Sequence, residues 1–127
     1  MAPYTHGDFR SMLLSTFPEL REQLEDWDFD YSLHFDMEAF ARYAQRAKGQ
    51  GDWQTYSTCI QLAEKLWQNA DSELSNAIGV SFLEQLDFEG PRGRHAWSIL
   101  PPVLQTAWQS VQKSIHPPLP HRKKRKK

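Results

Sequence analysis

The chain has 127 residues, of which 39% are apolar and 24% charged, as is typical of one soluble globular domain. No apolar run approaches the roughly 18 residues that a membrane span needs, and the first residues lack a basic and apolar leader. Cys59 is the single cysteine, which excludes an internal disulfide bond and a thiolate zinc cage. We therefore expect a cytoplasmic protein with no membrane segment.

The charges are distributed unevenly along the chain. All 16 Asp and Glu residues lie within residues 1–89, beside six Lys and Arg, so this part has a net charge of −10. Residues 90–127 contain nine Lys and Arg and no acid, which gives +9. The sequence predicts an acidic folded body with a basic end.

Helical spacing of apolar residues begins near the N-terminus. Thr5 is the predicted N-cap of a helix whose apolar positions are Phe9, Met12, Leu13 and Phe17. Pro18 suits the first turn of a second, short helix that ends near Trp27. The stretch Asp26–Ser32 alternates acids and aromatic rings; we expect a loop, and a short strand is the alternative.

The middle of the chain contains the clearest helix. Asp36 is the predicted N-cap of a helix that ends at Gly49 and Gly51. Asp52 is the predicted cap of the next, whose apolar row keeps helical spacing for five turns: Trp53, Tyr56, Ile60, Ala63, Trp67 and Ala70. Asp71 or Ser72 then begins a helix that runs to Leu86 and is apolar almost all round, so we expect it at the centre of the fold.

Glycine and proline divide the C-terminal part. We interpret Gly90–Arg94 as a helix-helix linker, followed by a short segment from His95 to Leu100. A last helix begins at Pro101 or Pro102 and carries the apolar stripe Leu104, Ala107, Trp108, Val111 and Ile115. Three prolines after it, and a basic run after those, predict a disordered tail.

These patterns predict an all-α fold of about five to six helices. Short connections favour antiparallel neighbours, as in an up-and-down bundle or a short stack of helical hairpins. Residues 1–116 form the predicted single helical domain, and residues 117–127 the predicted proline-rich and basic tail. No repeat of about 34 residues is present, which disfavours a repeat array.

Signs of catalytic chemistry are few. The five histidines are far apart and include no pair at i and i+4, so we predict no metal and no cofactor. Cys59 lies beside an apolar row and is the expected buried, inert thiol. No Gly-x-Ser-x-Gly motif occurs, and Ser81 lies inside a predicted helix. The sequence favours a protein that is not an enzyme; a buried carboxylate titrating near neutrality would favour one.

Acidic residues beside large rings are typical of a surface that attracts a basic partner and then anchors it. The same acids would also suit a solvated loop over buried rings. The predicted partner-binding residues are Asp26, Trp27, Asp28, Asp30, Tyr31, Glu84, Asp87 and Glu89.

The run Arg122–Lys127 is the densest cluster of one charge and suits contact with phosphate backbones. A solubilising terminus and residues added in cloning are competing interpretations. No aromatic residue interrupts the run, and the acidic body would repel nucleic acid, so nucleic-acid binding is disfavoured.

Four segments carry a resemblance to a known family: Phe17–Leu20, Asp36–Tyr43, Gly51-Asp52 before a long helix, and Asn76–Leu86. Over about residues 10–110 the chain resembles a family of small helical bacterial proteins of unknown biochemistry, which are similar to immunity proteins encoded beside secreted polymorphic toxins. The resemblance implies a binding role and brings no catalytic residues. We therefore expect an immunity protein that neutralises a cognate toxin, such as a basic nuclease. The alternative is a helical adaptor or nucleic-acid accessory protein that binds through the basic tail.

Overall fold

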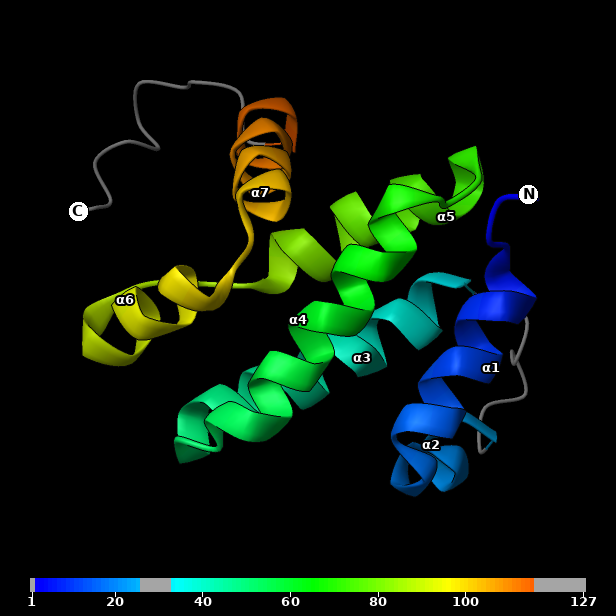
Figure 1. The fold of residues 1–127 in the computed structure, drawn as a ribbon, viewed down its shortest axis with the longest axis horizontal. Coiled ribbons are helices and arrows are strands. Elements are labelled where there is room, and N and C mark those ends of the chain that lie inside the picture. The colour runs from blue at the N-terminus through cyan, green and yellow to red at the C-terminus, as the bar shows by residue number, and fades with distance from the viewer. Residues whose placement is uncertain (1, 26–32, 116–127) are drawn as a thin grey trace.

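The computed structural model describes residues 2–25 and 33–115 (Figure 1). The described residues form helices and helical turns joined by short connections, and the pairing of Tyr4 with Ala70 is an isolated bridge rather than part of a strand among them. The elements are α1 (His6–Thr16), a 3₁₀ turn (Pro18–Leu20), α2 (Arg21–Glu25), α3 (Leu33–Gln50), α4 (Trp53–Gln68), α5 (Ser72–Ala77), a π-helical turn (Ile78–Phe82), a 3₁₀ turn (Leu83–Gln85), α6 (Gly90–Ile99) and α7 (Pro102–Ile115). The prediction of an all-α fold is confirmed. The predicted loop at residues 26–32 and the predicted disordered tail at residues 117–127 lie outside the described residues.

Three predicted helix starts are confirmed by hydrogen bonds. Thr5 forms a capping box with Asp8 at the start of α1. The Asp52 side chain accepts a hydrogen bond from the backbone N–H of Thr55 at the start of α4. The Asp71 side chain accepts a hydrogen bond from the backbone N–H of Leu74 at the start of α5. Each acceptor satisfies a backbone donor that the first turn of a helix leaves unpaired.

The prediction that Asp36 caps α3 is wrong. The helix begins at Leu33, one turn earlier, so Asp36 lies within its first turn. Its side chain is 1% exposed and accepts hydrogen bonds from His6 and Arg10 on α1. The carboxylate therefore joins α1 to α3 instead of capping a helix.

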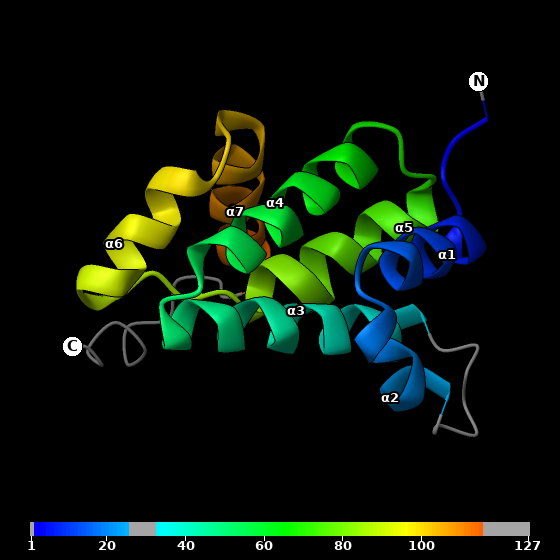
Figure 2. The ribbon, with the colours of Figure 1, turned by 60° about the horizontal axis from the view of Figure 1, so that its bottom comes forward.

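A central group of helices carries the core. α3 packs against α4, α5 and the π-helical turn, while α1 and α2 lie at one end of the molecule and α6 and α7 at the other (Figures 1 and 2). Fully buried rings fill the centre: the ring centroids of Phe40 and Phe82 are 4.7 Å apart, and those of Phe9 and Phe40 are 5.9 Å apart. Aromatic side chains give a small domain much buried apolar area per residue. Of the described helices, none is long and apolar enough to cross a membrane.

The predicted helix from Ser72 to Leu86 is largely buried, but it is not uniform. It passes from α5 into the π-helical turn and then the 3₁₀ turn. Gly79 faces α7, where a Cβ atom on it would lie 3.3 Å from Val111 Cγ2. Its small size therefore lets α7 approach the π-helical turn closely.

The prediction that Gly90–Arg94 is a linker is also wrong, because α6 begins at Gly90. Gly90 has a φ of +74°, which a residue with a side chain rarely adopts, and Pro91 follows in the first turn, where its missing N–H is harmless. Gly93 is buried against the backbone of Phe88; a Cβ atom on Gly93 would lie 2.1 Å from the Phe88 carbonyl carbon. The glycines start the helix and allow its close packing.

Candidate functional site

Three partly buried rings form an aromatic cluster at the α6–α7 end of the molecule: Phe88, Trp97 and Trp108. Their ring centroids are 5.0 Å apart for Phe88 and Trp97, 5.2 Å for Phe88 and Trp108, and 5.5 Å for Trp97 and Trp108. All three pairs meet edge to face, an arrangement that the charge distribution of aromatic rings favours. Each ring thus supports the other two and leaves part of its surface exposed.

Backbone contacts fix the aromatic cluster in place. The Trp108 indole N–H donates to the Leu86 carbonyl oxygen at 3.4 Å. The Gln105 side chain on α7 donates to the Trp97 carbonyl oxygen on α6 at 3.0 Å. Three apolar residues of the same part of the chain are buried: Ala96, Leu100 and Leu104. The cluster is therefore a built feature of the fold and joins three separate chain segments.

The aromatic cluster lines an open cavity of about 490 Å³. Its other lining residues are Arg94 on α6 and Gln109 on α7. A guanidinium group is only a donor, and the Gln109 amide contains both a donor and an acceptor. The cavity therefore offers aromatic surface together with hydrogen-bond donors.

Two of the predicted binding acids flank Phe88 in the chain. Asp87 accepts hydrogen bonds from Lys48 at 3.1 Å and from Gln45 at 3.3 Å, and its backbone oxygen accepts from Lys48 at 2.6 Å. Burial raises the pKa of Asp87, but the hydrogen bonds from Lys48 and from the backbone N–H of Glu89 outweigh it, and the pKa falls below its usual 3.8. Asp87 is therefore ionised at neutral pH.

Glu89 and Glu84 complete the acids of this region. Glu89 is exposed and takes the N-cap position of α6, although its side chain makes no capping hydrogen bond. Glu84 lies in the 3₁₀ turn and is half-buried. Ahead of the helix N-terminus, the Glu89 carboxylate lies where negative charge is favourable.

The structure places only part of the predicted binding surface. Asp87 and Glu89 lie beside the aromatic cluster, and Glu84 precedes them in the chain. The other predicted residues lie outside the described residues: Asp26, Trp27, Asp28, Asp30 and Tyr31. The sequence had placed Trp108 in an apolar stripe and had not singled out Phe88 or Trp97, because their meeting depends on how α6 packs.

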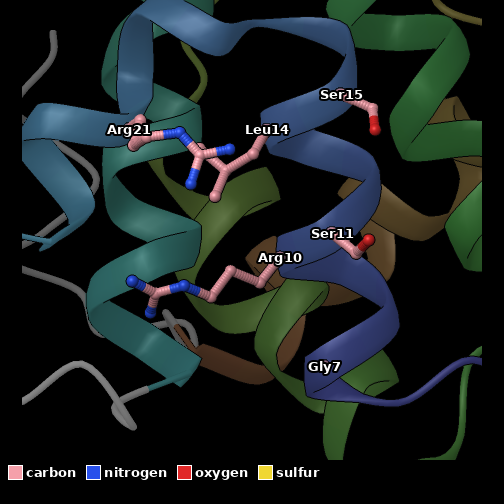
Figure 3. Close-up of a pocket in the computed structure, with 6 residues that line it drawn as sticks. All are labelled: Gly7, Arg10, Ser11, Leu14, Ser15 and Arg21. Carbon is pink, nitrogen blue, oxygen red and sulfur yellow. The ribbon is translucent and has the colours of Figure 1, made fainter.

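A second hollow, of about 430 Å³, lies on α1 and is polar (Figure 3). Arg10 and Arg21 extend to the same side of α1 with Leu14 between them, whereas Ser11 and Ser15 point away from them. Arg10 donates to the buried Asp36 carboxylate at 3.3 Å, and His6 Nε2 lies 2.7 Å from the same oxygen. These contacts give Arg10 a structural role in holding α1 on α3. The spacing of residues in the sequence did not predict this hollow.

The candidate nucleophiles are buried. Cys59 is fully buried, as predicted, and burial raises the pKa of its thiol to about 12. Ser81 is 3% exposed, and its hydroxyl lies 2.6 Å from His34 Nδ1. This contact ties the π-helical turn to α3. In the part of the chain that the structure describes, no group of three or more His, Cys, Asp and Glu is placed to hold a metal ion.

Comparison with known proteins gives a family and no function. No curated protein and no solved structure matches the chain. A family model described as a domain of unknown function, DUF7674, matches residues 10–116. This match spans most of the helical domain, from α1 to just after α7. The chain therefore belongs to the DUF7674 family.

Proposed function

We propose that this domain binds a basic partner protein through the aromatic cluster and the acids beside it, Glu84, Asp87 and Glu89. The observation behind the proposal is the position of Phe88, whose ring packs against Trp97 and Trp108 and whose two chain neighbours are acids. Large, pre-positioned rings are the usual energetic centre of a protein interface, and surrounding charges raise the rate at which the right partner arrives.

The chain as a whole has a net charge of only −1, but its acids are all in residues 1–89, and this part of the chain supports a basic partner. Residues 1–89 carry −10, so a cationic protein is attracted over roughly a Debye length, about 8 Å at physiological salt. Glu89 is exposed and able to face such a partner, whereas Asp87 is held by Lys48 and orders the segment. Attraction and anchoring thus come from different residues of one surface.

The more specific form of the proposal is an immunity protein. The family resemblance favours a cognate bacterial toxin as the partner, with a basic nuclease as the chemical type that the acidic surface fits. Neutralisation would then follow from occlusion of the toxin in the cytoplasm. This role needs a preformed surface and no cofactor.

The test is co-expression with the product of the neighbouring open reading frame. We expect the chain to restore growth when that product is toxic, and to purify in a stoichiometric complex with it. Glu89→Lys should weaken both effects, because it reverses a charge beside the aromatic cluster. Glu73→Lys is the matched control, since Glu73 is also an exposed acid at the start of a helix but lies on α5. An absence of rescue and of complex formation would contradict the proposal.

A further inference from the structure

We propose that the cavity of the aromatic cluster is a docking site for a proline-rich, basic segment, and that its occupant is the chain's own segment 116–127. This inference deepens the proposed function, because it names an intramolecular occupant for the same site. It stands on the chemistry of the cavity, on the sequence of the segment and on the short length of chain between α7 and the prolines.

The cavity matches proline chemically. Pro117, Pro118 and Pro120 have no backbone N–H, so these residues present apolar rings and carbonyl acceptors only. The cavity presents aromatic rings and the donor groups of Arg94 and Gln109. Grooves lined by aromatic side chains are the general docking sites for proline-rich segments, whose extended backbone loses little entropy on binding.

The charges of the segment and of the surface around the cavity are also opposite in sign. The prolines are followed by six cations, Arg122–Lys127. Phe88, at the cavity, is followed by Glu89 and preceded by Asp87. Arg94 would repel cations within the cavity itself, so the prolines suit the rings and the cations suit the acids. The segment thus resembles, in charge, the basic partner that the proposed function requires.

The chain is long enough for this contact. α7 ends at Ile115, and Trp108 lies seven residues before it, which corresponds to about 10 Å along the helix. An extended chain covers that distance in about three residues, so Pro120, five residues after Ile115, can reach the level of Trp108 with residues left for the chain to turn back. A short tether gives an effective concentration in the millimolar range, so even weak docking is well populated.

The consequence is competition. A basic partner must displace the segment before it reaches the aromatic cluster, and removal of the segment should strengthen partner binding. In the absence of a partner, the docked segment covers rings that would otherwise be exposed to water.

The experiment compares the indole N–H signals of the full chain with those of the Pro117→Ala, Pro118→Ala, Pro120→Ala triple variant by NMR. The three substitutions lie outside the described residues and change none of the buried residues of the helical core. We expect the signals of Trp97 and Trp108 to shift and those of Trp53 and Trp67 to stay in place. Signals are assigned through single Trp→Phe variants.

A synthetic peptide of residues 116–127 completes the test. Added to the triple variant, it should move the Trp97 and Trp108 signals back towards their wild-type positions in a saturable manner. A peptide with Gln in place of the six cations should bind at least tenfold more weakly and lose its dependence on salt.

Two results would overturn the inference: equal spectra for the full chain and the triple variant, or a peptide that has no effect. Shifts that grow with protein concentration would overturn the intramolecular contact in favour of a second copy. No partner protein is present in this experiment, so its failure leaves the proposed function untouched, and failed growth rescue with normal peptide docking would contradict the proposed function alone.

Discussion

The Lys48 ammonium group on α3 lies 2.6 Å from the backbone oxygen of Asp87 and 3.1 Å from its Oδ1. Lys48 is 8% exposed, so its apolar stem is packed in the protein while its ammonium group contacts Asp87. Asp87 directly precedes Phe88. The contact between Lys48 and Asp87 therefore anchors the segment that carries Phe88, one ring of the aromatic cluster, to the central helices.

Asp87→Asn should lower stability in a pH-dependent way. The pKa of Asp87 is lower in the folded chain than its usual 3.8, so the ionised carboxylate stabilises the fold above that value and loses its effect as the pH falls below it. Because the side chain of Asp87 is 64% exposed, we expect a loss of only about 0.5 to 1 kcal/mol at pH 7. Urea unfolding at pH 7 and near pH 2 measures the change, which should be smaller at the lower pH. Glu73→Gln is the control, and an equal loss in both variants would rule out the Lys48 contact as the cause.

Gly93→Ala and Gly49→Ala should have opposite effects although both lie in helices. A Cβ atom on Gly93 would lie 2.1 Å from the backbone of Phe88, so α6 must shift, at a cost of about 1 to 3 kcal/mol or more. A Cβ atom on Gly49 meets no atom within 4 Å, so the substitution should stabilise α3 by about 0.5 to 1 kcal/mol. Thermal unfolding gives the sign of each change, and the near-ultraviolet circular dichroism of the tryptophans should weaken only for Gly93→Ala. Stabilisation by both substitutions would contradict the close approach of α6 to Phe88.

Asp36→Asn should destabilise the domain by about 2 to 3 kcal/mol. Asp36 is 1% exposed and accepts hydrogen bonds from His6 and Arg10, so its neutralisation leaves two donors of α1 without a charged acceptor. Glu38→Gln, which removes an exposed ion pair with Arg42 in the same helix, should cost less than about 0.5 kcal/mol. Denaturant unfolding of the two variants makes the comparison, and similar losses would show that the contact between α1 and α3 does not depend on this carboxylate.

Cys59 should resist alkylation in the folded protein. Its side chain is fully buried and burial raises the pKa of the thiol to about 12, so almost no thiolate is present or accessible at pH 8. We expect iodoacetamide to modify it only as fast as the domain unfolds, and rapidly in concentrated urea. Modification of the folded chain at the rate of a free cysteine would place the thiol at the surface.

Local signals in the sequence were sufficient for most of the fold. The caps at Thr5, Asp52 and Asp71 act within three residues, so their spacing predicts them directly. Asp36 looked like another cap, but its Oδ2 atom accepts from His6 and Arg10, which lie 30 and 26 positions earlier in the chain. Such a partner is set by the packing of α1 on α3 and leaves no trace in the local pattern.

The candidate site was harder to predict for the same reason. Gly90 and Gly93 suggested a linker, whereas the first turns the chain into α6 and the second allows α6 to lie against Phe88. Only that close contact brings Trp97 and Trp108 together with Phe88. The alternation of acid and ring at Asp87, Phe88 and Glu89 was present in the sequence, but the role of the ring depended on residues from two other segments.

The most direct test of the central claim is the rate at which the purified partner associates with the wild-type chain, with Glu89→Lys and with Glu73→Lys. Stopped-flow fluorescence measures this rate over a range of salt concentrations. If the surface beside the aromatic cluster attracts a basic partner, Glu89→Lys should lower the association rate constant at least tenfold at low salt and flatten its salt dependence. Glu73→Lys should then stay close to wild type. Equal effects of the two reversals, or no effect of either, would contradict the assignment of this surface as the binding site.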